Sequence, residues 1–421
     1  MLDINNVIKS GELSYLKSIK CMAQKIDTCI ETSKENHRKR STDAKIFGQI
    51  DATTLSCHPQ NRPNIVHFFG SAHDEFYNGV SLYYMRDAYR NLIERAESPV
   101  SRLYNHILLH CHPDGTWSFP TSLDDNGIHS AERVSLETVI STINSLKPVA
   151  AAPYMFCMPG MTTVRGLFEM IGVPVIGNTS ESMSLSTNKW QTLCLLKAAG
   201  VPVAKNELLT KKKDQEKIPM PTMKAPFIIK PCSEGNSLGI SLFKGEKDED
   251  LKSKLEYAFD YDNDVLVEQF IPLGHEVRVA VIEDENQNLE VLPICNYILN
   301  ESRPIRTLED KLQTDEDGVP TTPTKCTREL PAVSLPDKVI SSIEHYALKA
   351  HAALGCRDYS IFDIRVSPDG TPYFIEASLY CCYASTSIIV LMSEAAGRKP
   401  YELFNVALSR AIQRNSKKQL K

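Results

Sequence analysis

The segment from Tyr359 to Ser387 restricts the fold more than any other, because it contains two runs of alternating residues on either side of a turn. The turn, Ser-Pro-Asp-Gly at residues 367–370, ends in glycine, where a positive φ is often needed. The pattern therefore predicts a β-hairpin with one face in a core. Asp363 and Glu376 lie on the other face, so two carboxylates project from a rigid support.

The register of this hairpin determines how the two carboxylates lie. We expect Val366 to pair with Thr371, which puts Asp363 opposite Phe374 and leaves Glu376 on the neighbouring diagonal, within side-chain reach. The core face then carries Phe362, Ile364, Val366, Tyr373, Ile375 and Ala377, and the outer face carries Ile361, Asp363, Arg365, Phe374, Glu376 and Ser378. Two such carboxylates suit Mg²⁺, which often binds one or two of them together with substrate phosphates. An ordinary surface hairpin is the alternative.

Length and composition indicate a multidomain enzyme. A chain of 421 residues exceeds one compact core and predicts two or three domains. The net charge of −5 argues against a general affinity for nucleic acid or an anionic membrane, so neither is an expected partner. No apolar run approaches the roughly 18 residues of a membrane span, and the N-terminus lacks a secretory pattern. The twelve cysteines show no repeated CxxC spacing, which favours reduced thiols and a cytoplasmic location.

The N-terminal half suggests an extension followed by an α/β domain. Residues 1–60 read as a short amphipathic helix and a charged linker. From Asn64, a buried-strand run leads into a polar turn with His73, Asp74 and Glu75, which can either bind substrate at the strand end or cap the next helix. The histidines near residue 110 read as part of a strand pair, with a zinc cluster as the lesser alternative.

Residues 224–245 have the pattern of a phosphate-binding hairpin. A hydrophobic strand leads into Lys230 and then a loop of small and polar residues, whose candidate phosphate contacts are Ser233, Glu234, Gly235, Asn236, Ser237 and Gly239. Such a loop can bend tightly and present backbone N–H groups to phosphate oxygens, while the lysine neutralises charge. The spacing is not GxxxxGK[ST] and no helix follows, so this is not a P-loop. A plain glycine hairpin is the alternative.

Two further segments carry weaker signals. Glu268 ends one strand run and Glu276 opens the next, so both can contact an adenine amino group or ribose hydroxyls. Residues 300–330 form a long loop rich in proline, threonine and charge, which is either functional or a solvated charge run.

The order of these motifs resembles the ATP-grasp superfamily, in its D-alanine:D-alanine ligase branch, over roughly residues 64–410. The resemblance implies an α/β and α+β multidomain chain, with an ATP-grasp fold after an N-terminal α/β (pre-ATP-grasp) domain. The domains would be an extension at 1–60, a substrate domain at 61–180, and two ATP-grasp subdomains at 181–270 and 271–421, with a lid at 300–330.

The resemblance also assigns roles, with ATP and Mg²⁺ as cofactors. Lys189 and Lys230 would contact phosphates beneath the closing glycine loop. Glu268 would lie at the adenine and Glu276 at the ribose. Asp363 and Glu376 would hold Mg²⁺ together with Ser378, which stands where the family usually has a metal-binding asparagine. Glu75 falls where the family binds the amine of the first amino acid.

The departures from the family concern the cation near the transferred phosphoryl group. The family has arginine two positions before the metal aspartate, where this chain has Ile361. Arg365 follows Asp363 by two positions and is our predicted replacement, because phosphoryl transfer depends on such charge stabilisation. Arg278 and the lid residue Lys311 complete the candidate catalytic set.

Several phrases, among them MFCMPGMT, IGNTSESM and FIEASLYCCYA, are similar to the ligases of mycosporine-like amino acid biosynthesis. Those enzymes attach an amino acid, typically Thr or Ser, to mycosporine-glycine and so form an imine. On this reading Arg306 lies on the lid over the substrate, and Ser385 and Ser387 are candidates for recognising the amino acid. A dipeptide ligase using an acyl phosphate and a non-catalytic ATP-binding protein are the alternatives, and a homodimer is an arrangement that the sequence allows.

Overall fold

The computed structural model describes residues 62–95, 97–212, 217–235, 237–307, 310, 313–314, 320–321 and 327–419. The predicted helix and linker at 1–60 lie outside the described residues, as do Asn236 and Lys311. In the part that is described, no helix has the length and apolar character needed to cross a membrane.

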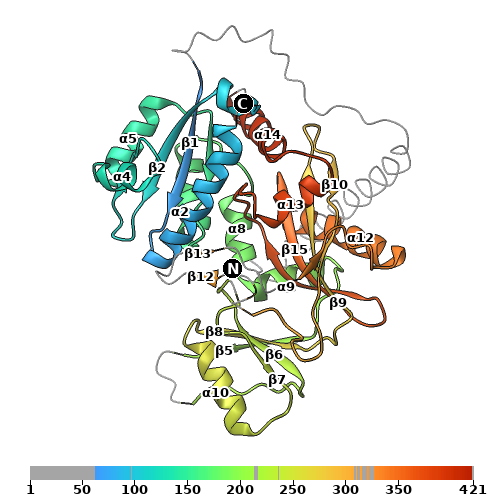
Figure 1. The fold of residues 1–421 in the computed structure, drawn as a ribbon. Helices are drawn as coiled ribbons and strands as arrows, with labels where there is room; N and C mark the ends of the chain where they lie inside the picture. Colours follow the sequence, from blue (N-terminus) through green and yellow to red (C-terminus); the bar gives the residue numbers. More distant parts are fainter. Residues whose placement is uncertain are drawn as a thin grey trace, which may run out of the picture.

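The first of three main sheets is built from the N-terminal region and has the order β3-β2-β1-β4 (Figure 1). Its strands are β1 (Asn64–Gly70), β2 (Asn105–Cys111), β3 (Trp117–Ser118) and β4 (Ala150–Pro153). β1 runs parallel to both neighbours, while β2 and β3 form the antiparallel strand pair expected near His110. The helices of this region are α2 (Glu75–Tyr89), a π-helical turn η2 (Arg90–Glu94), α3 (Pro99–Leu103), α4 (Asp125–Ser130), α5 (Leu136–Leu146), α6 (Met158–Met161), α7 (Thr163–Met170) and α8 (Ser180–Thr187).

The second sheet is antiparallel throughout and has the order β5-β8-β6-β7. It consists of β5 (Asn206–Thr210), β6 (Phe227–Pro231), β7 (Ser241–Phe243) and β8 (Asp264–Gln269). Helix α9 (Lys189–Ala198) precedes it, and α10 (Asp248–Phe259) buries Leu251 and Leu255 in one core cluster with Phe227 and Ile229 of β6. This unit lies at the end of the molecule farthest from β1 (Figure 1).

The third sheet is also antiparallel and has the order β14-β11-β9-β15-β16, with β10 paired to β9. Its strands are β9 (His275–Glu283), β10 (Leu289–Val291), β11 (Cys295–Tyr297), β14 (Arg328–Glu329), β15 (Tyr359–Val366) and β16 (Pro372–Ser378), and its helices are α12 (Asp337–Ala353), α13 (Ile388–Ala395) and α14 (Pro400–Gln419). Within the segment 300–330, where we expect a lid, β12 (Gln313–Thr314) pairs with β13 (Pro320–Thr321), and β13 contacts α2. This segment therefore reaches the N-terminal region.

The predicted hairpin is present as β15 and β16, but its register differs from the expected one. Val366 pairs with Pro372 instead of Thr371, and Asp363 pairs directly with Glu376. A β-bulge between Asp363 and Ile364 leaves one extra, unpaired residue on β16. The residues of β16 between the bulge and the turn therefore point to the opposite side of the sheet from the one expected. Phe374 consequently lies in the core, and Tyr373 is paired with Arg365. The assignment of Phe374 to the outer face and of Tyr373 to the core was wrong for this reason.

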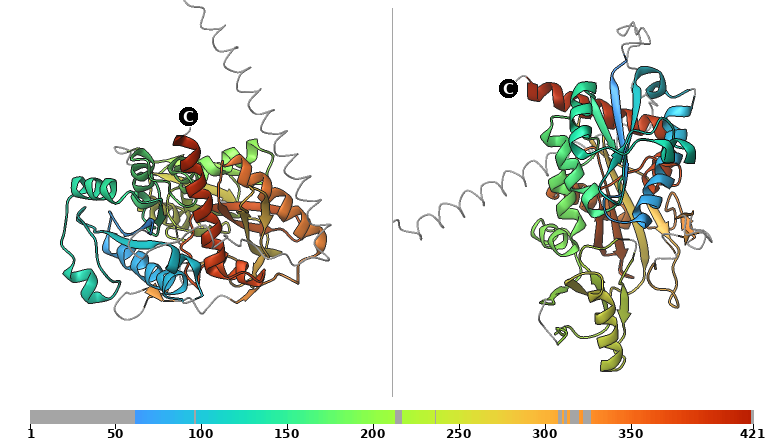
Figure 2. Two further views of the ribbon diagram at one scale, coloured as in Figure 1. Left: turned by 90° about the horizontal axis from the view of Figure 1, so that it is seen from above. Right: turned by 90° about the vertical axis from the view of Figure 1, so that its left-hand side faces the viewer.

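A buried ion cluster ties the N-terminal region to the third sheet. Asp358 precedes β15 with a φ of 64° and accepts a hydrogen bond of 2.8 Å from the backbone N–H of Gly177. Two arginines of α14, Arg410 and Arg414, donate to the same carboxylate at 2.6–3.1 Å. Helix α14 crosses between the two regions (Figure 2, left). One carboxylate thus fixes the relative position of three segments that are distant in sequence.

Candidate nucleotide and acceptor site

Two adjoining cavities lie where the three sheets meet. The larger, of about 660 Å³, is lined by α2, the glycine loop, β9 and β16; the smaller, of about 80 Å³, lies between the second and third sheets. Lys189, Arg306 and Glu376 line both cavities and therefore mark their junction. Concave sites between subdomains are the usual location of ligand binding.

Lys230 and Glu268 form a buried ion pair in the smaller cavity. Lys230 is on β6 and Glu268 on the adjacent strand β8, with the ammonium nitrogen 3.2 Å from both carboxylate oxygens. Burial raises the pKa of Glu268, and the neighbouring Lys230 opposes that rise. The structure therefore brings together the two residues that the sequence assigned to phosphate and adenine, in a pocket that also contains Phe270.

Lys189 lies at the start of α9, directly after the N-cap Asn188, whose side chain accepts a 3.0 Å hydrogen bond from the Gln191 N–H. Its ammonium group is buried and donates to the backbone carbonyl of Glu234 in the glycine loop. Burial lowers the pKa of Lys189, while Glu376 acts to raise it. A lysine from a helix start thus reaches the junction of the two cavities.

The glycine loop joins β6 to β7 and faces both cavities. Ser233, Glu234 and Gly235 line the larger cavity, and Ser237 lines the smaller one and donates a 3.1 Å hydrogen bond to the carbonyl of Arg306. Gly239 has a φ of +68°, and a Cβ there would lie 2.5 Å from Cγ of Pro231, so a larger residue cannot be accommodated without strain.

Three arginines surround two buried carboxylates on the third sheet. Arg306 donates to Glu276 at 2.6 Å through Nε and to Asp363 at 2.5 Å through Nη2. Arg278 also binds Asp363, at 2.6 Å through Nε and 3.1 Å through Nη2. Arg365 lies 2.8 Å from Glu276. Burial acts to lower the pKa of Arg306, but Asp363 and Glu276 outweigh it and raise that pKa, so the guanidinium stays charged.

The residues expected to hold Mg²⁺ fit that ion in the presence of a phosphate ligand. Asp363 and Glu376 are directly paired across β15 and β16, and Ser378 is two residues beyond Glu376 on the wall of the larger cavity. Among the described residues, no three His, Cys, Asp or Glu side chains are arranged to hold a metal ion. The protein therefore offers two carboxylates and a weaker hydroxyl donor, and phosphate oxygens would complete the octahedral shell that Mg²⁺ requires.

Two predicted substrate contacts do not line the cavities. Glu75 is exposed in the first turn of α2 and accepts from the Asn78 side chain at 2.9 Å, whereas Asp74 lines the larger cavity. Asp74 also caps α2 through the N–H of Tyr77. Ser385 donates its backbone N–H to Asp87 and lies outside the lining, while its neighbours Thr386 and Ser387 are part of it. The structure therefore does not bring Glu75 and Ser385 to the cavities, and their expected roles stay predictions.

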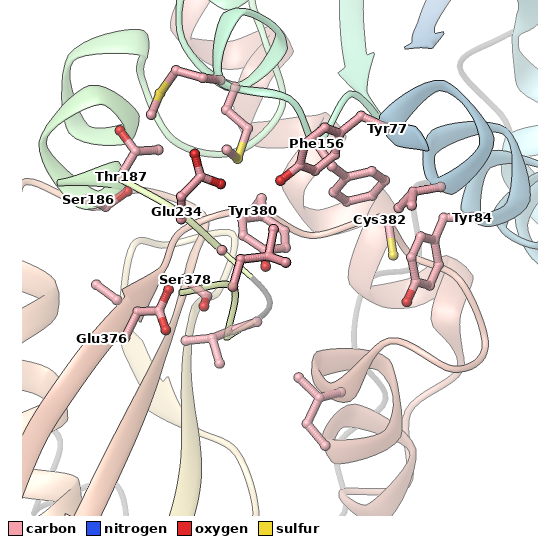
Figure 3. A pocket seen from close by; sticks show the side chains of 18 of the residues that line it. Tyr77, Tyr84, Phe156, Ser186, Thr187, Glu234, Glu376, Ser378, Tyr380 and Cys382 are labelled. Carbon is pink, nitrogen blue, oxygen red and sulfur yellow. The ribbon is translucent and has the colours of Figure 1, made fainter. Parts of the chain in front are cut away.

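Aromatic side chains form a wall of the larger cavity that the sequence did not reveal. Tyr84 comes from α2, Phe156 follows β4, Tyr297 is on β11 and Tyr380 follows β16. Figure 3 shows Tyr84 and Phe156 on one side of the pocket, Glu376 with Ser378 on the other, and Tyr380 between them. These residues are far apart in sequence, so no local pattern could have identified them together. The cavity has aromatic surface on one side and oxygen ligands on the other.

Comparison with known proteins relates this site to a family of ligases. A family model described as the D-ala D-ala ligase C-terminus matches residues 195–408. The D-alanine–D-alanine ligase of Geobacter sulfurreducens is 29% identical over 217 residues, covering 51% of this chain and 62% of that protein. D-alanine–D-alanine ligase B of Chromobacterium violaceum is 28% identical over 235 residues, covering 56% and 71%. The chain thus matches a little under two thirds of the Geobacter sequence.

Solved structures share the architecture. The VanG D-Ala:D-Ser ligase of Enterococcus faecalis gives a TM-score of 0.66 at 22% identity, covering 83% of this chain and all of that one. A D-alanine–D-alanine ligase of Bacillus anthracis complexed with ATP gives 0.61 at 18%, covering 85% and 99%. The fold is therefore that of the ATP-grasp ligases, preceded by an N-terminal α/β domain. Because the family model spans half of the chain, this protein belongs to the D-Ala–D-Ala ligase family.

Proposed function

We propose that this protein is an ATP-dependent ligase of the D-alanine–D-alanine type, which phosphorylates an oxygen atom of an acceptor and joins the activated carbon to an amine. The observation that carries the proposal is the junction of the two cavities. There a buried lysine, Lys189, meets Glu376, one of the two paired carboxylates. Phosphoryl transfer needs positioning and charge stabilisation more than covalent chemistry, and the junction provides both.

The smaller cavity is the proposed nucleotide side. Lys230, Lys189 and the glycine loop give it cations and backbone N–H groups. Asp363, Glu376 and Ser378 would hold Mg²⁺, which supplies neutralisation of phosphate charge when it is bound. Asp363 already binds two arginines, and one of them, Arg306, belongs to the lid. A cation that binds Asp363 would therefore have to displace Arg306 from this carboxylate or bind it together with Arg306.

The larger cavity is the proposed acceptor side. In the first candidate reaction, the acceptor carboxylate oxygen takes the γ-phosphoryl group, and the bond from that phosphorus to the bridging oxygen of ADP breaks. The amine nitrogen then forms a bond to the acyl carbon, phosphate leaves with the former carboxylate oxygen, and the ammonium protons pass to solvent. The products are an amide, ADP and phosphate. The likeness to D-alanine–D-alanine ligases supports this carboxylate chemistry.

A second candidate acceptor is the ring carbonyl of mycosporine-glycine, with an amino acid such as Thr or Ser as the amine. Ile361, where the family has arginine, lines the larger cavity beside the aromatic wall. That exchange removes a cation suited to a small carboxylate and adds apolar surface suited to a ring. Phosphorylation of the carbonyl oxygen would be followed by amine addition and loss of phosphate, which leaves an imine. Water must be kept from either activated acceptor, and the lid over the cavity suits that requirement.

One experiment separates the candidates. The protein would be incubated with MgATP and, in parallel, with D-alanine, with each standard amino acid, or with mycosporine-glycine plus each amino acid, while ADP release is followed. ADP with D-alanine alone supports the dipeptide ligase. ADP that requires mycosporine-glycine, with a shift of its ultraviolet absorption, supports the imine-forming ligase. Absence of ADP above the level of a Glu376→Gln control with every acceptor would refute catalysis by this site.

A further inference from the structure

We infer that Arg278, on β9, supplies the cation that the ligase family carries at the position of Ile361, and that it contacts the transferred phosphoryl group. The inference rests on the proposed function and goes beyond it by assigning a residue to charge stabilisation. Two observations carry it: Arg278 lies next to Ile361 on the neighbouring strand, and its side chain lines the larger cavity while Asp363 holds one edge of its guanidinium.

The first observation concerns the sheet. Ile361 pairs with Ala280 across β15 and β9, and Asp363 pairs with Arg278. Arg278 and Ile361 are therefore diagonal neighbours on one face, and at the separation of such neighbours, about 7–8 Å, long side chains still meet. An arginine on β9 can thus place its guanidinium where an arginine on β15 would have placed its own.

The second observation concerns the side chain itself. Arg278 lines the larger cavity together with Ile361 and Glu376. Its Nε and Nη2 are held by Asp363, while Nη1 has no hydrogen-bond partner within the described residues. A guanidinium fixed on one edge and open on the other is preorganised to bind an anionic oxygen. Asp363 thus orients Arg278 as well as serving as a candidate metal ligand.

Arg365, the replacement predicted from the sequence, does not occupy this place. It lies two residues beyond Asp363 in the direction away from Ile361, and it lines only the smaller cavity. Its Nη2 donates to the carbonyl of Pro304 at 2.6 Å and is 2.8 Å from Glu276. Arg365 therefore lies on the proposed nucleotide side of the site, and on the present inference Arg278 takes the role that the sequence predicted for Arg365.

The test uses a planar mimic of the transferred phosphoryl group, so that it does not depend on knowing the acceptor. Thermal unfolding is measured with MgADP and with MgADP plus aluminium fluoride. For the wild type, a mimic complex that binds tenfold tighter than MgADP raises the Tm by roughly 3 °C more. Arg278→Ala should lose this increment and keep the response to MgADP alone. Arg365→Ala, the matched contrast, should weaken the response to both.

Charge relocation provides the decisive variant. Ile361→Arg, introduced into Arg278→Ala, should restore the aluminium fluoride increment, because the cation returns to the same face of the sheet. A merely structural role for Arg278 predicts no such rescue. Where the acceptor is known, Arg278→Ala should lower kcat by about 10²- to 10³-fold, the loss typical for one donor to a developing oxyanion, and Arg278→Lys should lose less.

Three outcomes overturn the inference: an aluminium fluoride increment that survives Arg278→Ala, a loss of MgADP binding equal to that of the mimic, or a wild type that shows no increment. A wild type without the increment is a different result from failure of the proposed function. That failure would be seen as absence of ADP release with every acceptor. An increment without turnover would support the role of Arg278 while refuting the tested acceptors.

Discussion

Replacing Asp358 with asparagine tests whether the buried ion cluster holds the N-terminal region against the third sheet. Asparagine keeps the size of the side chain and tolerates the left-handed backbone at this position, where φ is 64°. The substitution therefore tests the effect of the negative charge separately from the effects of side-chain size and backbone conformation. The Asp358 side chain is fully buried and accepts from the backbone of Gly177 and from two arginines of α14, Arg410 and Arg414.

The expected cost follows from this geometry. Removing one partner of a buried ion cluster costs about 3–5 kcal/mol where a charge stays buried without its partner. Arg410 keeps its ion pair with Glu283, whereas Arg414 loses the carboxylate that it binds through two nitrogens, so we expect a cost toward the lower end of that range. At about 2 °C for each kcal/mol in a chain of this size, the Tm should fall by roughly 6–10 °C. The control is Glu256→Gln, which removes an exposed pair with Lys252 at 3.8 Å. That change should cost less than about 1 kcal/mol.

Differential scanning calorimetry measures both variants. Because Gly177 adjoins α8, whose residues Met183 and Ser186 line the larger cavity, Asp358→Asn should also raise the KM for the acceptor more than the KM for ATP. The reasoning is refuted if Asp358→Asn melts within 1 °C of the control variant, since the cluster would then contribute no more than a surface pair.

Three further outcomes are expected. Glu376→Gln should abolish ADP release and leave the circular dichroism spectrum unchanged, because it removes a proposed metal ligand; turnover near the wild-type level would exclude Glu376 from the mechanism. MgATP at about 100 times its Kd should stabilise the protein by about 2.7 kcal/mol, and EDTA should abolish the shift in a thermal melt; an EDTA-resistant shift would argue against the metal. Burial lowers the pKa of His110 to about 3 and that of His67 well below 6.5. At His110 the unfolded chain therefore binds more protons than the folded one between about pH 3 and 6.5, so this histidine should cost about 1.4 kcal/mol of stability per pH unit as the pH falls below 6.5, and His67 should act in the same direction. Urea unfolding at pH 7.5 and 5.5 measures this loss, and His110→Gln should reduce it.

The sequence predicted the fold because its clearest local patterns lie in segments that form central parts of the fold. Strand alternation in residues 359–378 and the glycine loop after Lys230 each determine a local structure, and their order along the chain matches one architecture. The carboxylate pair was predictable for the same reason. Asp363 and Glu376 belong to the two strands of one hairpin, so a local pattern was enough to bring them together.

The parts of the site that the sequence did not predict depend on contacts between distant segments. A single bulge between Asp363 and Ile364 changes which side of β16 faces the core, and no residue type near it signals that extra position. Arg278 was in the candidate catalytic set, but the place of the missing arginine was assigned to Arg365 by alternation along one strand, and only the pairing of β15 with β9 shows Arg278 next to Ile361 on the wall of the larger cavity. Sequence spacing identifies the residues that share a strand, whereas the site is formed across strands.

Charge at the junction also explains why so many ionisable groups can be buried there. In the smaller cavity, four cations lie among four carboxylates: Lys189, Lys230, Arg306 and Arg365 with Glu268, Glu276, Asp363 and Glu376. Ion pairs among these groups offset part of the desolvation cost that each charge carries when it is buried. Because Arg306, in the segment 300–330 that we expect to be a lid, contacts both Asp363 and Glu276, the same residue connects that segment to the proposed nucleotide side.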